Sequence, residues 1–183
     1  PAGGRAFHSA TLIGDDTVLI AGGRVFIDDQ GAEDVLGTAF LFSTRGYIDW
    51  LGDTSQRPWS DVINMGPGNA YRRADHAAVS VDSRRAVLVG GISDVRTDAS
   101  GYPNLRLEIV QLTNTLPGVI LFDLDQDRLG GSFKAVGTPL QKPRAGARLA
   151  LRNSGNGPEV LVVGGYDAGN AVGAIEVLKN LNG

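Results

Sequence analysis

The sequence predicts an all-β fold made of short antiparallel strands, and three observations lead to this class. Helical periodicity is hard to find anywhere in the 183 residues. Glycine accounts for 26 residues without a collagen-like period, which indicates many tight turns and therefore many short strands. One long segment also recurs along the chain with its features in the same order, as in repeat architectures.

The recurring segment begins with an arginine and ends with a pair of glycines. The first copy, residues 5–23, reads RAFHSATLIGDDTVLIAGG, and the second, residues 73–91, reads RADHAAVSVDSRRAVLVGG. The third, residues 144–165, reads RAGARLALRNSGNGPEVLVVGG and has Ala147 where the first two copies have histidine. The glycine pairs lie 68 and 74 residues apart (22 to 90, then 90 to 164), so loops are inserted between fixed strands.

Each copy contributes a series of strand signals. Residues 8–13 are expected to form a strand that is followed by a polar turn. The apolar runs 18–21, 87–89 and 160–163 are too short for helices and are typical of strands covered on both faces. A third strand is expected after each glycine pair, at 38–42, 119–123 and 174–178, and a fourth around Trp59 and Phe133.

We therefore expect a single segment of three units, at approximately residues 1–68, 69–140 and 141–183. Small four-stranded sheets bury both faces when they stack radially. A residue without Cβ lets the backbone turn sharply and lets a neighbouring unit approach closely. We expect this structural role for the six paired glycines: Gly22, Gly23, Gly90, Gly91, Gly164 and Gly165.

The order Arg-x-x-His, apolar strand, turn, V-L-[IV]-[AV]-G-G, then a strand such as ILFDLD and an aromatic strand resembles the kelch repeat over nearly the whole chain. The resemblance implies a kelch-type β-propeller fragment of about three four-stranded antiparallel blades, the last incomplete. Ala147 and the long insertions depart from the kelch pattern, whose unit is about 50 residues. Propellers close with about four to eight blades, so the remaining blades are expected from the same or another chain.

Composition excludes several classes of partner. The net charge is −3 and no block of like charge is present, so a nucleic-acid surface is not expected. The chain has no cysteine, which removes disulfides and thiolate metal sites. No apolar run approaches the roughly 20 residues of a membrane span.

Two sets of residues are tied to the repeat. His8 and His76 are the only histidines, and their shared position favours a structural hydrogen bond over a metal ligand or a catalytic base. Arg5, Arg73 and Arg144 recur in the same way. We expect them to bridge adjacent blades through carbonyls or acids, the alternative being that they hold an anionic ligand.

Ligand-binding candidates lie where long loops emerge. The connections 24–35 and 92–118 both join a second strand to a third, so strand parity places them on one face. Segment 43–58 is expected as a long loop on the opposite face. Arg24, Arg72 and Arg96 lie in or near the face of the first two connections and are the candidates for binding a ligand.

One segment could hold calcium. Asp123, Asp125 and Asp127 alternate in DLDQDRLGG, and oxygen ligands at that spacing suit Ca²⁺. The segment departs from an EF-hand loop because Arg128 stands where glycine is required. An acidic turn between the third and fourth strands is the favoured interpretation, and calcium is the alternative.

No catalytic motif accompanies the repeats: the chain has no G-x-S-x-G elbow and no Walker-type loop. The sequence therefore predicts a non-catalytic module that presents loops to a protein or glycan partner. One alternative is part of a carbohydrate-active enzyme with a galactose oxidase-like fold, whose active site would lie largely outside this segment. That family's copper site needs a cysteine-linked tyrosine, and this chain has no cysteine.

A third possibility is a structural subunit of a surface assembly whose ring is completed between chains. Strands of the VLIAGG type resemble those of bacterial secreted or surface propellers. The resemblance therefore implies an extracellular or cell-surface location, with the cytoplasm as the alternative.

Overall fold

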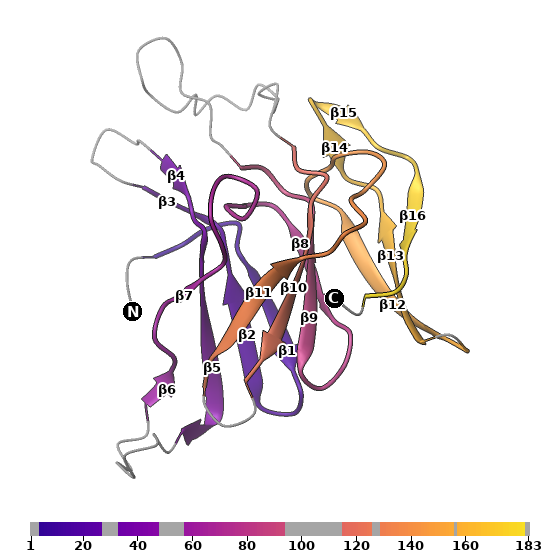
Figure 1. Ribbon diagram of the computed structural model, residues 1–183. Helices are drawn as coiled ribbons and strands as arrows, with labels where there is room; N and C mark the ends of the chain where they lie inside the picture. Colours follow the sequence, from indigo (N-terminus) through magenta and orange to yellow (C-terminus); the bar gives the residue numbers. More distant parts are fainter. Residues whose placement is uncertain are drawn as a thin grey trace.

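The computed structural model describes residues 4–26, 33–47, 57–93, 115–125, 129–155 and 157–181, which form strands and no helix (Figure 1). The first sheet contains β1 (Ser9–Ile13), β2 (Thr17–Ala21), β5 (Thr38–Tyr47) and β6 (Arg57–Trp59), with β7 (Ile63–Asn64) also paired to β5. The middle sheet contains β8 (Ala77–Ser80), β9 (Arg85–Val89), β10 (Val119–Leu124) and β11 (Gly131–Ala135). The third contains β12 (Arg148–Ser154), β13 (Gly157–Val163) and β16 (Ile175–Leu178). The predicted all-β class is confirmed.

The strands agree closely with the sequence pattern. All neighbouring strands in the three sheets pair antiparallel, and the second strand of each unit lies between the first and the third. Trp59 and Phe133 lie on the expected fourth strands and stack on aromatic rings of the third strands, Phe42 at 4.9 Å and Phe122 at 4.8 Å between ring centroids. Strand β5 runs on to Tyr47, so part of the segment expected as a loop is a strand.

The two central strands of the middle sheet, β9 and β10, are buried on both faces, which explains their continuous apolar runs. In β9 the residues Ala86, Val87, Leu88 and Val89 are at most 1% exposed, although their side chains point alternately to opposite faces. Residues 119–122 of β10 are buried in the same way. Covered sheets favour runs of apolar residues over alternation, because neither face contacts water.

Two apolar clusters join the three sheets. The cluster between the first and middle sheets contains Leu19 and Leu41 on one side and Leu88 and Phe122 on the other. The cluster between the middle and third sheets consists mainly of Val87, Val89, Val119, Leu121, Val160, Val162 and Leu178. Each fully buried valine or leucine contributes about 1.5–3 kcal/mol, so these clusters account for much of the stacking energy.

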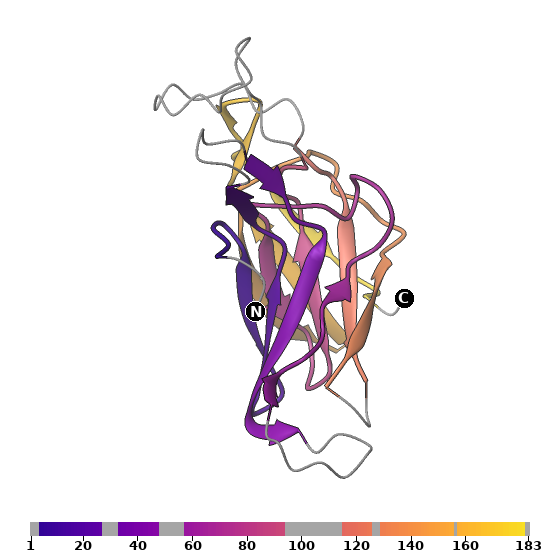
Figure 2. The ribbon, with the colours of Figure 1, turned by 90° about the vertical axis from the view of Figure 1, so that its left-hand side faces the viewer.

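Two hairpins project from the stack. Strands β3 (Arg24–Phe26) and β4 (Glu33–Val35) pair with each other and lie in the connection from β2 to β5. Strands β14 (Tyr166–Asp167) and β15 (Asn170–Ala171) form the second hairpin, in the connection from β13 to β16. Figure 1 and Figure 2, which views the molecule from the side of the first sheet, both place the two hairpins at the same end of the stack. We call it the insertion end, because it carries the connections between second and third strands. The β3–β4 hairpin lies in the connection 24–35, where only a loop was expected.

Candidate binding surface at the insertion end

The first two glycine pairs are the points at which neighbouring sheets meet. Gly22, Gly90 and Gly164 have φ angles of 60°, 65° and 67°, and the glycines after them have φ of 96°, 100° and 98°. A Cβ added to Gly22 would lie 2.3 Å from the Arg73 carbonyl oxygen, and one added to Gly90 would lie 2.2 Å from that of Arg144. The following N–H groups, of residues 23 and 91, donate to the same two carbonyls at 2.8 and 2.9 Å. The missing side chain therefore makes room for the backbone of the next sheet.

The side chains of the repeat arginines stabilise their own sheets. Arg73 Nη1 donates to the carbonyls of Gly90 and Gly118, at 3.2 and 3.3 Å, which end the second strand and begin the third. The other two arginines make the same pair of bonds: Arg5 to Gly22 and Thr38, and Arg144 to Gly164 and Ala174. Burial lowers the pKa of Arg73 to about 10, so the guanidinium stays charged at neutral pH. The bridge between units that was expected from the arginine side chains is made instead by the main-chain carbonyls of Arg73 and Arg144.

The two histidines occupy the same repeat position in different surroundings. His76 lies between the first and middle sheets, where its Nε2 and Ser9 Oγ share a hydrogen bond of 2.7 Å. Burial lowers the pKa of His76 to about 3, and the positive charge of Arg73 acts in the same direction. The ring is therefore neutral at physiological pH. His8, in the first sheet, is exposed.

A main-chain link also runs across the sheets at the third position of each repeat. Phe7, Asp75 and Gly146 all have positive φ, between 53° and 62°. The Asp75 N–H donates to the Phe7 carbonyl at 3.0 Å, and the Gly146 N–H donates to the Asp75 carbonyl at 2.8 Å. These residues thereby fix the relative position of the three sheets at the insertion end.

A small apolar cluster supports the hairpins. Val35, Ala74, Ile92 and Ala145 are buried together, and Tyr166 packs against them. Each unit also has an isolated antiparallel β-bridge outside its strands, between Ala6 and Arg24, Ala74 and Ile92, or Ala145 and Tyr166. The base of each described hairpin is thus held by backbone pairing as well as by apolar contact.

Four side chains form an aromatic and charged surface over this base, which we call the Phe7 surface: Phe7, Arg24, Asp75 and Tyr166. The Phe7 ring is 51% exposed, and the Arg24 guanidinium carbon lies 3.8 Å from its centroid. The Tyr166 hydroxyl donates to Asp75 Oδ2 at 2.9 Å. Burial raises the pKa of Tyr166 and the carboxylate of Asp75 raises it further, so the hydroxyl keeps its proton.

The Tyr166 ring occupies space that a side chain at Gly146 would fill. A Cβ at Gly146 would lie 2.8 Å from the Tyr166 ring, whereas the equivalent positions in the other units carry Phe7 and Asp75. On the same hairpin as Tyr166, the Asp167 carboxylate accepts a hydrogen bond from Thr115 Oγ1. The surface therefore combines an aromatic face, a cation, carboxylates and a hydroxyl, which are groups that bind polar or carbohydrate ligands.

The remaining candidate arginines are placed separately. Arg72 donates from Nε to the Val35 carbonyl at 2.8 Å and pairs with the Asp34 carboxylate. It lines an open depression of about 300 Å³ that Asn64 also borders. Arg96 lies outside the described residues. Of the two candidates that the structure describes, Arg24 belongs to the Phe7 surface and Arg72 does not.

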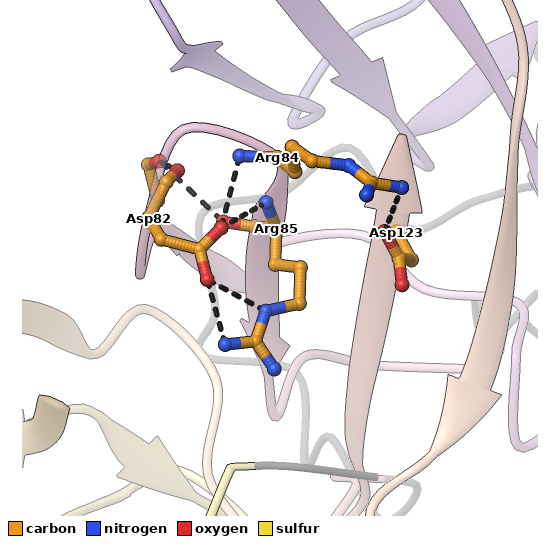
Figure 3. A network of polar contacts seen from close by, with 5 residues as sticks. Asp82, Arg84, Arg85 and Asp123 are labelled. Carbon is orange, nitrogen blue, oxygen red and sulfur yellow. Dashed lines mark hydrogen bonds and ion pairs between the residues drawn. The ribbon is translucent and has the colours of Figure 1, made fainter. Parts of the chain in front are cut away.

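Of the three aspartates considered for calcium, Asp123 takes part in a network of charged residues with Arg84 (Figure 3). Arg84 Nη2 contacts Asp123 Oδ1 at 3.3 Å and donates to the Leu124 carbonyl at 2.8 Å. Asp82 accepts from the backbone N–H groups of Arg84 and Arg85 at 2.9 and 2.8 Å. Burial acts to raise the pKa of Asp82, but these bonds and the Arg85 guanidinium lower it overall.

Within the described residues, no group of three or more histidine, aspartate or glutamate side chains is arranged to hold a metal ion. Asp127 lies outside the described residues. Asp123 is engaged by Arg84, and the N–H of Asp125 donates to the Gly130 carbonyl at 2.9 Å, as in a closed turn.

Sequence reasoning missed most of the Phe7 surface. Phe7 and Asp75 occupy the third position of the repeat, between the arginine and the histidine, and Tyr166 follows the third glycine pair directly. The available signal was an aromatic residue, Phe7, at a repeat position where the other units have Asp75 and Gly146. This signal emerges only when the sequences of the three units are aligned.

No protein-family model matches this chain, and a search of curated proteins finds no match. Among the residues that the structure describes, there is no helix with the length and hydropathy needed to cross a bilayer.

Proposed function

We propose that the chain is a section of a kelch-type β-propeller that acts as a non-catalytic binding module, presenting the insertion end to a protein or glycan partner outside the cell. The proposal rests above all on the Phe7 surface, an exposed aromatic and charged cluster on a rigid base. Sites of this kind on loops and hairpins are where rigid β-scaffolds usually bind ligands.

The repeat supports the propeller part of the proposal. Three units share the same strand order, the same arginine bonds and the same positive φ angles at the glycine pair. A middle sheet covered on both faces is what radial stacking of small sheets requires. An experimental structure of the longest available form of the protein tests this part. Further sheets stacked on the first or third sheet are expected, and a different packing of the three sheets would contradict it.

The chemistry of the Phe7 surface supports the binding part. An exposed ring covered on one side by a guanidinium offers a flat apolar contact, while the nearby carboxylate and hydroxyl are held by each other in a fixed orientation. His76 and Arg73, which could otherwise serve in catalysis, are buried in structural contacts.

Binding is tested with the whole chain on a glycan array and, in a separate arm, on an array of extracellular protein domains. We expect ligands in one arm and a loss of about tenfold in affinity for Phe7→Ala, equivalent to about 1.4 kcal/mol. Val62→Ala is the matched control, because Val62 is 56% exposed but lies in the connection between β6 and β7. Binding that both variants weaken equally, or a folded chain that binds nothing in either arm, would contradict the assignment.

A further inference from the structure

The outer face of the third sheet carries exposed apolar residues beside an ion-pair network of Arg152, Glu159 and Lys179. Ile175 is 62% exposed, Val177 41% and Val163 40%. Strand register gives each of these residues a counterpart on the middle sheet. Ile175 pairs with Val163, and their counterparts are Val119 and Val89. Val177 has Leu121 as its counterpart. The counterparts Val119, Leu121 and Val89 are at most 2% exposed, because the third sheet covers them. The same type of face is therefore covered in one sheet and open in the next.

The glycine pair of the third sheet is open in the same way. Gly164 has the φ of Gly22 and Gly90, yet a Cβ at Gly164 would meet nothing within 4 Å. The N–H of residues 23 and 91 donates to an arginine carbonyl of the following sheet. Within the described residues, no corresponding carbonyl lies at Gly165. The third sheet thus presents a vacant position for an arginine carbonyl of the repeat type.

The first sheet presents the face that would fit. Its outer side carries Phe40 and Phe42, whose register counterparts Ile120 and Phe122 are the middle-sheet residues packed on the first sheet. Phe40 is 8% exposed, because the Arg5 guanidinium lies over its ring, and Phe42 is half-buried. Leu12, also on this side, is 55% exposed. Arg5, which precedes β1, holds the repeat position of Arg73 and Arg144, whose carbonyls occupy the glycine sites.

From these complementary faces we infer that a second copy of this chain docks on the third sheet through its first sheet. The inference rests on the proposed propeller architecture and names the partner for its open faces. In the docked pair the Arg5 carbonyl of one copy occupies the Gly164 and Gly165 site of the other, and Leu12 and Phe42 cover Val163, Val177 and Ile175.

The charges at the turns of the two faces are also complementary. Inside the chain, the β1–β2 turn at Gly14 abuts the β8–β9 turn, since a Cβ at Gly14 would lie 3.1 Å from the Ser83 carbonyl oxygen. Turns of adjacent sheets therefore meet. By the same geometry, the turn carrying Asp15 and Asp16 of one copy meets the end of β12 and β13 of the other. There Arg152, which is 56% exposed, and Lys179 both pair with Glu159, so this group keeps a net positive charge.

The contact is head-to-tail, so it uses two different faces of each chain. Two copies provide six sheets, which lies within the range of about four to eight blades over which propellers close. A closed pair leaves neither apolar face exposed. This removes the patches that would otherwise favour aggregation.

Sedimentation velocity of the full chain at micromolar concentration tests the inference. We expect a species of twice the 19.2 kDa chain mass. Leu12→Arg and Ile175→Arg should each weaken association about 100-fold or more, since each places a charge in an apolar contact. Both positions are exposed in the single chain, so circular dichroism should show unchanged folding. Ser132→Arg, at an exposed position of the edge strand β11, should leave association intact.

Mixing the two arginine variants distinguishes head-to-tail from symmetric contact. Each variant keeps one intact face, so a mixture should form a heterodimer through a single interface although neither variant associates alone. A pair that Leu12→Arg abolishes but Ile175→Arg leaves unchanged, or the reverse, would overturn the inference.

A third variant addresses the glycine site directly. Asparagine tolerates the φ of 67° at Gly164, and its Cβ meets nothing in the single chain. Gly164→Asn should therefore fold but lose the pair. If the wild type sediments as a single chain whose structure keeps three stacked sheets, this inference fails while the proposed function stands; if the sheets are not stacked, both fail.

Discussion

The middle and third sheets share an apolar second strand that ends at a glycine pair and pairs with a third strand in the same register, but they differ in what covers them. The run Val87, Leu88, Val89 of the middle sheet is buried on both sides, whereas Val163, the counterpart of Val89, is 40% exposed. Burial in this fold is therefore a property of the position in the stack rather than of the residue. Matched substitutions in the two sheets measure what the neighbouring sheet contributes.

The largest difference is expected at the first glycine of the pair. Gly90→Ala and Gly164→Ala carry the same backbone strain, because φ is 65° and 67°. At Gly90 the new Cβ would also lie 2.2 Å from the Arg144 carbonyl oxygen. We expect a loss of about 4 kcal/mol at Gly90 and about 1–2 kcal/mol at Gly164.

Urea unfolding in the Ile175→Arg background, in which assembly is blocked, provides this measurement. Equal losses at the two glycines would show that the approach of the next sheet is not what requires glycine.

A smaller difference is expected in the apolar contacts. Leu121 is fully buried between the middle and third sheets, and its counterpart Val177 is 41% exposed. Leu121→Ala should cost about 3 kcal/mol through the lost contacts and the cavity, and Val177→Ala less than about 1 kcal/mol. Thermal unfolding of both variants at low protein concentration checks the comparison, and a large loss at Val177 would mean that this face is covered in the single chain.

The smallest effect concerns protonation. The unfolded chain protonates His76 below a pH of about 6.5, but the folded protein holds its pKa at about 3, so the unfolded state binds more protons across this interval. Stability is therefore full above pH 6.5 and falls as the pH is lowered toward 3. Between pH 6.5 and 5 the loss from this group is about 1.5 kcal/mol.

The histidines supply their own control. His76→Gln should remove this part of the pH dependence, measured as the urea midpoint at each pH, while His8→Gln should preserve it because His76 is still present. An unchanged slope in His76→Gln would place the responsible group elsewhere.

Much of the fold could be predicted from the sequence, because uninterrupted apolar runs such as residues 87–89 are short and end at glycine pairs. The β3–β4 hairpin escaped prediction since its strands have three residues each and include Glu33 and Asp34. The hydrogen bond between Ser9 and His76 joins two repeats, and no local sequence pattern predicts which residues of neighbouring repeats come into contact. The Phe7 surface was missed for the same reason, because Phe7 and Tyr166 come from the first and third units.

The contacts that join the sheets have a consequence for how such a chain can evolve. Arginine carbonyls, glycine N–H groups and the left-handed residues Phe7, Asp75 and Gly146 make these contacts with backbone atoms. Side chains at most other positions can then drift, and insertions of different length can accumulate, without altering the joints. Descendants of one ancestral unit could therefore lose recognisable sequence kinship while keeping the same joints, so kinship among such chains is better sought in backbone geometry than in residue identity.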